Sequence, residues 1–297
     1  MVSTRFAVRS DRIKSNPKRA PVQGGDMAYE NIIYEKRQHI AYITINRPER
    51  LNAISPPTQI ELWDALIDFR NDDDSWVVIM TGAGDRAFSA GHDLKWGSEH
   101  PGESPDWGHN YQSDPERIGL AGALPTEIWK PMIAAVNGYA AGGGMEMTLH
   151  ADIIIASEHA QFGVPEVRNV GGLPGAGGIF RLPRQVPYKV AMWMLLSGQY
   201  LSAEYMHNVG YVNEVVPHEK LMETAESYAR LLTANPPIGV QTSKEVALRS
   251  LDLPLDHPRT AWEYLWEGTT AKMRNSEDSQ ESRRAWLEKR PPVFHNR

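Results

Sequence analysis

The sequence predicts an α/β protein: a mostly parallel sheet built from strand–helix units, followed by a helical C-terminal region. Three observations lead to this prediction. Short apolar runs occupy residues 76–80, 132–136 and 153–156, as buried strands do. Apolar residues at helical spacing fill 58–69, between two strand-like runs, which indicates a βαβ unit with parallel strands. From His218 onward, helical spacing dominates.

The chain begins with a polar, basic segment. Residues 1–27 lack the apolar core of a signal peptide, so we expect a disordered N-terminal extension, with Met27 as an alternative start. Residues 29–34 and 40–45 are typical of two strands, the second rich in strand formers. The turn residues at 36–39 join them into a hairpin.

Two stretches after the helix expected at 58–69 resemble ligand-binding motifs that we do not assign. The acidic run at 71–74 is typical of a solvated turn and not of a metal site. Residues 81–87 mimic a GxGxxA dinucleotide fingerprint, but no long helix follows, so we reject that interpretation.

A long loop at 97–125 is rich in Gly, Pro, Ser and charge. We interpret its first part as a mobile lid over a pocket, with Trp96, Trp107 and Tyr111 as candidate wall residues. The alternative, that these aromatic residues only fasten the loop, remains equally open.

The C-terminal half is punctuated by clear helix signals. A Gly-rich entry precedes a helix within 174–182, and Ser202 and Gly210 are typical of a helix start and stop. Residues 211–216 are expected to form a short strand. Further helices are expected at 190–197, 220–232, 238–251, 260–274 and 277–288.

The length, composition and net charge of the sequence argue against several classes of protein. The chain has 297 residues, 41% of them hydrophobic, enough for one large domain with a real core. A net charge of −6 argues against nucleic acid as the main partner. The chain contains no cysteine, which excludes disulfides and suits a reducing compartment, and no apolar run approaches the ~18 residues of a membrane helix. We therefore expect a soluble, cytoplasmic protein with no nucleic-acid or membrane partner.

Residues 137–178 organise the rest of the chain. The glycine run 142–144 lies between a strand-like run and a helical segment, so backbone N–H groups at the helix start face a close ligand. Glu146 follows in the first helical turn, and Glu166 follows a second strand-like run. Either residue alone is most simply a favourable first-turn acid or a solvated loop residue. Together with aimed N–H donors, the two carboxylates suit proton transfer beside a carbonyl.

The motifs NGYAAGGGMEM, ADIIIAS, AQFGVPEV and GGLPGAGGIFRLPR resemble the crotonase (enoyl-CoA hydratase/isomerase) superfamily. The likeness extends from about Tyr29 to the C-terminus. It implies a crotonase-like ββα spiral core with CoA and the active site at 28–217. It also implies a helical oligomerisation region at 218–297, in a homotrimer or homohexamer.

The resemblance also implies the residues of the site. The FSAGHDLK stretch is similar to the family's first oxyanion loop, so the backbone N–H groups of His92 and Gly143 would hold an enolate oxygen. Many relatives have Ala at the position of His92. Glu146 would activate water and Glu166 would protonate Cα. The residues implied in CoA binding are Ala90, His92, Asp93, Leu94, Lys95 and Gly143.

The expected activity is that of an enoyl-CoA hydratase or dehydratase in fatty-acid metabolism, with no metal and no cofactor besides the CoA of the substrate. Both glutamates favour hydration, and the C-terminal sequence EKRPPV resembles dehydratases of branched or carnitine-like acyl-CoAs. Two alternatives remain. One is an isomerase or thioester hydrolase of the same superfamily, and the other is a non-catalytic binding or scaffold protein.

Overall fold

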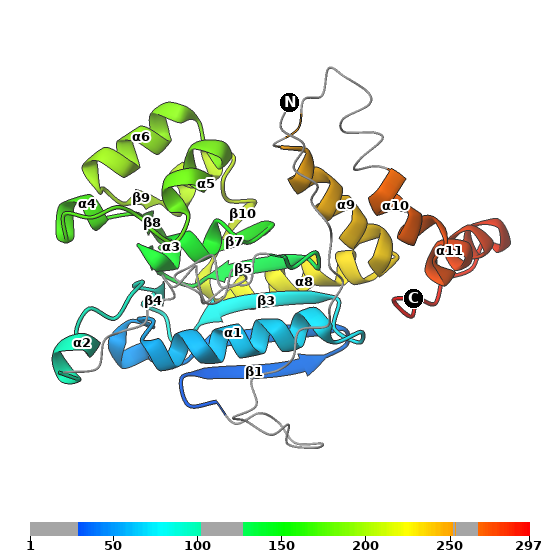
Figure 1. Ribbon diagram of the computed structural model, residues 1–297, viewed down its shortest axis with the longest axis horizontal. Helices are drawn as coiled ribbons and strands as arrows, with labels where there is room; N and C mark the ends of the chain where they lie inside the picture. Colours follow the sequence, from blue (N-terminus) through cyan, green and yellow to red (C-terminus); the bar gives the residue numbers. More distant parts are fainter. Residues whose placement is uncertain (1–28, 102–126, 252, 254–266) are drawn as a thin grey trace, which may run out of the picture.

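The computed structural model describes residues 29–101, 127–251, 253 and 267–297. Its larger sheet has six strands in the order β1-β2-β3-β5-β7-β10 (Figure 1), and every neighbouring pair is parallel except the β1–β2 hairpin. The predicted α/β class with a mostly parallel sheet is therefore confirmed. The strands are β1 (Ile32–Arg37), β2 (Ile40–Ile45), β3 (Val77–Gly82), β5 (Met132–Val136), β7 (Ile153–Ser157) and β10 (Glu214–Val216).

A second sheet holds four short strands in the order β4-β6-β8-β9. Three times along the chain, a strand of the larger sheet is followed by a strand of this sheet and then by a helix, which confirms the ββα spiral core. The helical segment expected after the glycine run is α3, but the strand β6 before that run was not predicted, because a three-residue strand is too short to show a hydrophobic period. The elements are β4 (Ala87–Ser89), α2 (Trp96–Glu99), β6 (Tyr139–Ala141), α3 (Gly143–Thr148), β8 (Gln161–Gly163), α4 (Glu166–Asn169) and β9 (Leu201–Ser202).

The central strands of the larger sheet are buried on both faces, and their side chains alternate between two apolar clusters. Ala134 and Val136 of β5 face the cluster that holds α1 and the small sheet. Ile133 and Ala135 face the other cluster, which holds α8 (Leu221–Thr233). A strand covered on both sides needs a continuous apolar run, which is why β3, β5 and β7 were visible in the sequence.

The hairpin and the first helix agree with the prediction apart from their ends. Gln38 and His39 both have positive φ, so a tight two-residue turn joins β1 and β2, and β1 starts later than expected. Helix α1 (Pro56–Asn71) begins at Ser55, whose hydroxyl accepts the Thr58 N–H, and it extends the predicted helix at both ends.

Helix α8 belongs to the core by its packing, although it lies within the predicted helical tail. Leu221, Ala225 and Ala229 are buried against the larger sheet. The helices α9, α10 and α11 instead stand to one side of the sheet (Figure 1). The remaining helices are α5 (Gly178–Gln185), α6 (Tyr188–Ser197), α7 (Ala203–Asn208), α9 (Pro237–Ser250), α10 (Glu267–Arg274) and α11 (Glu277–Glu288).

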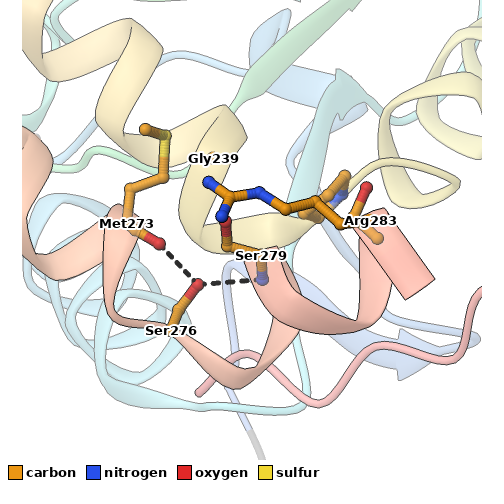
Figure 2. A pocket seen from close by; sticks show the side chains of 7 residues that line it. Gly239, Met273, Ser276, Ser279 and Arg283 are labelled. Atoms are coloured by element: carbon orange, nitrogen blue, oxygen red, sulfur yellow. Dashed lines mark hydrogen bonds between the residues drawn. The ribbon is translucent and has the colours of Figure 1, made fainter.

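The C-terminal helices enclose a pocket that Figure 2 shows from close by. Ser276 caps α11 there: its hydroxyl donates to the Met273 carbonyl and accepts the Ser279 N–H. Gly239 and Arg283 line the same pocket. None of its lining residues belongs to the predicted site.

Several predictions fall outside the described residues. These are the N-terminal extension, most of the expected lid with Trp107 and Tyr111, and the first part of the helix expected at 260–274. Within the described ranges, no helix is long and apolar enough to cross a membrane.

Candidate active site

Glu146 projects from the first turn of α3, and its carboxylate is almost fully buried. Its Oε1 accepts the N–H of Gly178 at the start of α5, at 2.8 Å. A Cβ on Gly178 would lie 2.9 Å from that oxygen, and one on Gly144 would lie 2.1 Å from the Ser89 carbonyl oxygen. Gly178 therefore lets the start of α5 approach the carboxylate, and Gly144 lets α3 approach the backbone of Ser89.

Glu166 is the first residue of α4, directly after Val164 and Pro165, which follow β8. Its Oε1 lies 3.0 Å from the position that a Cβ on Gly142 would occupy, so the carboxylate rests against the glycine turn before α3. Its Oε2 is buried with no hydrogen-bond partner among the described residues. The structure thus brings together the two predicted glutamates, 20 positions apart in the chain.

Both carboxyl groups hold their proton more tightly than an exposed carboxyl group does. Burial, together with repulsion from Glu166, raises the pKa of Glu146 to about 7. The hydrogen bonds from the Gly178 and Ala176 N–H groups lower this pKa but do not offset the effect of burial. Burial also raises the pKa of Glu166. A pair of this kind can hold one proton and exchange it at neutral pH, which is what general acid–base catalysis requires.

The two predicted oxyanion donors lie on loops that touch. Gly91 has φ +81°, and a Cβ there would lie 2.7 Å from the backbone nitrogen of Gly143. The next residue, His92, pairs with Ile54 as an isolated parallel bridge. In that bridge Ile54 donates to the Gly91 carbonyl at 2.8 Å and accepts from the Asp93 N–H at 3.0 Å. The first loop is thereby held at the N-terminus of α3, where N–H groups have no helical partner.

Three polar side chains that the sequence did not reveal hold the first loop. The Asn52 amide donates to the carbonyls of Ala83 and Ala87. The Ser89 hydroxyl donates to the Asn52 carbonyl at 2.8 Å and accepts the Gly91 N–H at 3.1 Å.

The Asn137 amide completes this set by donating to the carbonyls of Gly82, Gly84 and Ala87. Asn52, Ser89 and Asn137 are all buried. These hydrogen bonds satisfy their polar groups, as burial in a protein core requires. Ser89 and Asn137 lie within the motifs FSAGHDLK and NGYAAGGGMEM, but their hydrogen-bonding role was not predictable, since most of the partners are distant carbonyl groups.

The predicted CoA-binding residues follow on the same loop. Leu94 and Lys95 are exposed and Ala90 is half-buried. Asp93 differs from the expectation: its carboxylate is buried, pairs with Arg47 at 2.9 Å and accepts the N–H groups at the start of α2. We assign the Asp93 side chain to holding the loop.

Trp96, a predicted pocket-wall residue, is buried, and its ring stacks on His100 with centroids 4.3 Å apart. Among the described residues, no group of three or more His, Asp or Glu side chains could hold a metal ion.

A ββα spiral that places one buried and one half-buried carboxylate beside two touching glycine-containing loops is typical of the crotonase class of CoA-thioester enzymes. The enoyl-CoA hydratase/isomerase family model matches residues 35–297, and the chain belongs to this family. The resemblance stated from the motifs is confirmed.

Named relatives agree in chemistry. An (E)-benzylidenesuccinyl-CoA hydratase of Thauera aromatica is 38% identical over 264 residues, covering 89% of this chain and 98% of the relative. A carnitinyl-CoA dehydratase of Salmonella typhi is 37% identical over 274 residues, covering 90% and 99%. Among solved structures, an enoyl-CoA hydratase from Mycobacterium tuberculosis superposes with a TM-score of 0.81 at 32% identity, covering 90% of this chain and 99% of that one.

Proposed function

We propose that this enzyme adds water across the 2,3 double bond of an enoyl-CoA thioester, or removes water to form it. The observation that carries the proposal is the pair Glu146, which is buried, and Glu166, which is half-buried with a buried Oε2, both beside the start of α3. The hydratase and dehydratase named among the relatives support the same reaction class.

The proposed mechanism begins with charge on the thioester oxygen. Attack of water at C3 pushes electrons onto that oxygen, and the backbone N–H groups of His92 and Gly143 would stabilise the enolate. One such donor typically contributes roughly 3–4 kcal/mol to lowering the barrier. Glu146 would take a proton from the attacking water, and Glu166 would deliver one to Cα. Water is the only co-reactant, so the scheme uses no metal or redox cofactor, and CoA enters as part of the substrate.

The pH dependence of turnover follows from the shared proton. The active pair carries one proton, which for hydration must be on Glu166 while Glu146 is ionised. The pair loses this last proton as the pH rises through about 7, the raised pKa of Glu146 in the presence of the ionised Glu166. We therefore expect kcat/KM for hydration to fall about tenfold per pH unit above that value. Because the reaction neither takes up nor releases a proton, kcat/KM for dehydration must fall with the same profile. A profile that is flat between about pH 6 and pH 9 would contradict this assignment.

The loop-holding role of Ser89 gives a second prediction. Ser89→Ala removes the bonds to Asn52 and to the Gly91 N–H, so the first oxyanion donor loses its fixed position. We expect kcat to fall about tenfold, the effect of a lost hydrogen bond of roughly 1.5 kcal/mol, with little change in KM. Ser98→Ala, which removes an exposed hydroxyl on α2, is the control. Equal kcat values for the two variants would refute the role.

Product analysis tests the proposed function itself. Purified protein is incubated with crotonyl-CoA and with longer and branched enoyl-CoAs, and loss of the conjugated thioester absorbance is followed with mass analysis. Hydration adds the mass of water, isomerisation conserves mass, and hydrolysis releases free CoA. Binding of CoA esters with no turnover of any of them would favour the scaffold alternative and overturn the proposal.

We further propose a homotrimer or homohexamer. Large apolar side chains are exposed on α5, α6 and α11; they include Phe180, Trp193, Leu196, Trp286 and Leu287. Apolar surface of this extent is typical of subunit contacts. Light scattering on the purified protein measures the mass, and a monomer at micromolar concentration would refute this proposal. The cytoplasmic location and the place in fatty-acid metabolism stay predictions.

A further inference from the structure

Tyr200 lies between helix α6 and strand β9, and the proposed mechanism does not use it. Its half-buried ring covers Gly163, the last residue of β8: a Cβ on Gly163 would lie 2.6 Å from the ring carbon Cδ1. Phe162 pairs with Leu201 where β8 and β9 run antiparallel, and Gly163 and Tyr200 are the next pair in that register. Glycine at this position lets the aromatic ring come close to the strand backbone.

The glycine under this ring is bonded to the glycine turn before α3. The Gly163 carbonyl accepts the N–H of Gly142 at 2.8 Å, and Gly142 immediately precedes the proposed oxyanion donor Gly143. The Glu166 carboxylate rests on the same turn, with Oε1 3.0 Å from the Cβ position of Gly142. Glu166 follows Gly163 closely in the chain. The ring of Tyr200 therefore supports both the segment that carries Glu166 and the turn against which its carboxylate lies.

The turn before Tyr200 also packs against the segment that carries Glu166. Gly198 ends α6 with a φ of +63°, and a Cβ there would lie 3.0 Å from the Arg168 Cβ and 3.3 Å from the Pro165 Cα. The guanidinium carbon of Arg168 lies 5.8 Å from the centroid of the Tyr200 ring, within the range of a cation–π attraction. Residues before and after Glu166 therefore contact this turn.

Glu166 is close enough for its charge to act on the Tyr200 hydroxyl. Burial raises the pKa of Tyr200; the positive charge of Arg168 lowers this pKa, and the negative charge of Glu166 raises it. On another side, the ring of Tyr139 packs edge to face against Tyr200, with the two centroids 5.7 Å apart. An aromatic pair of this kind adds to the packing that keeps the Tyr200 ring over Gly163.

We propose that Tyr200 is a positioning residue for Glu166: its ring, packed on Gly163, holds the Glu166 carboxyl group against the glycine turn before α3. This inference rests on the proposed function, in which Glu166 delivers a proton to Cα of the substrate. Proton transfer is efficient only when donor and acceptor lie within hydrogen-bond reach. Without the ring, β8 and the residues that follow it can relax into the space left behind. A displacement of about 1 Å can lower a rate about 100-fold.

The first test removes the ring and measures hydration of the enoyl-CoA that wild type hydrates fastest. Tyr200→Leu should lower kcat about tenfold to a hundredfold and leave KM within about threefold, because Glu166 acts on the reacting carbon and not on the CoA part. Tyr200→Phe keeps the ring and should stay within about twofold of wild type. Tyr205→Leu is the matched control, since it removes a tyrosine ring that is 45% exposed on the nearby α7, and it should also stay within about twofold.

A double-mutant cycle shows whether Tyr200 acts through Glu166. In a Glu166→Gln background the proton donor is already lost, so adding Tyr200→Leu should lower the remaining rate by less than about twofold. Single-turnover measurements with excess enzyme follow these slow rates. A merely structural role of the ring would multiply the two effects. Equal effects of Tyr200→Leu in the two backgrounds would therefore overturn the inference.

The same measurements separate this inference from the proposed function. If wild type hydrates no enoyl-CoA, the proposed function fails. If wild type is active and a folded Tyr200→Leu variant keeps its kcat, only the inference is overturned; a Tyr200→Phe variant as slow as Tyr200→Leu would assign the effect to the hydroxyl and overturn it as well. Thermal unfolding checks that the variants fold. Should Tyr200→Leu not fold, Tyr200→Met, whose flexible side chain covers Gly163 in part, takes its place in the cycle.

Discussion

Glu146→Gln should lower kcat for hydration by about 10²–10⁴-fold, the range typical of a lost general acid–base group. Gln has nearly the same shape, and its amide oxygen can still accept the Gly178 N–H, so the fold of the site should persist. The Gln side chain, however, cannot take a proton from water. Loss of the conjugated thioester absorbance measures the effect on several enoyl-CoAs.

The control for this experiment is Glu158→Gln, which changes an exposed carboxylate just after β7. It should leave kcat within about twofold of wild type, as surface substitutions away from a site do. A Glu146→Gln variant that keeps more than a tenth of wild-type activity would remove Glu146 from the mechanism.

The same substitution should stabilise the protein at alkaline pH. Burial raises the folded-state pKa of Glu146 to about 7 from 4.5. The folded state therefore holds the proton more tightly, and the stability that this provides is lost as the pH rises from about 4.5 to 7. A shift of this size corresponds to about 3 kcal/mol. Gln does not ionise and has no such pH dependence. The unfolding free energy of the variant minus that of wild type should therefore be about 3 kcal/mol larger at pH 8 than at pH 4.

Denaturant unfolding at the two pH values measures this gain. A constant difference between the two proteins at both pH values would contradict the raised pKa, whatever the activity of the variant.

Gly91→Ala should lower kcat by about 10²–10³-fold, the effect of losing an oxyanion donor. An added Cβ would lie 2.7 Å from both the Ala141 carbonyl oxygen and the Gly143 nitrogen, and both are backbone atoms that cannot step aside. The two loops must separate, so the N–H groups of His92 and Gly143 would no longer converge. Single-turnover rates separate this loss of chemistry from weaker binding of the substrate.

Gly210→Ala is the matched control for backbone strain. Gly210 has φ +84°, close to the +81° of Gly91, but a Cβ there would meet nothing within 4 Å. It therefore carries the same unfavourable backbone conformation, worth about 1 kcal/mol, without the contact between loops. If both variants lose activity equally, strain and not loop separation is responsible, and the proposed oxyanion arrangement is wrong.

The order of the larger elements was predictable because their signals are local. Strands β5 and β7 are buried on both faces and must be apolar throughout, and helices such as α7 carry their own N-cap and stop residue. The small sheet was not predictable, because β4, β6 and β8 have three residues each and are stabilised by one another across long stretches of chain.

For the candidate site, the sequence by itself determined the chemistry: two glutamates, the glycine turns beside them, and the family to which they belong. These features could be predicted because few other functions require glycine-rich turns and carboxylates in that spacing and order. Only the tertiary structure decided which groups support them. Asn52, Ser89 and Asn137 act through distant carbonyl groups, and α8 joins the core through packing. Burial and partnership across the chain depend on the complete fold, and no local pattern contains them.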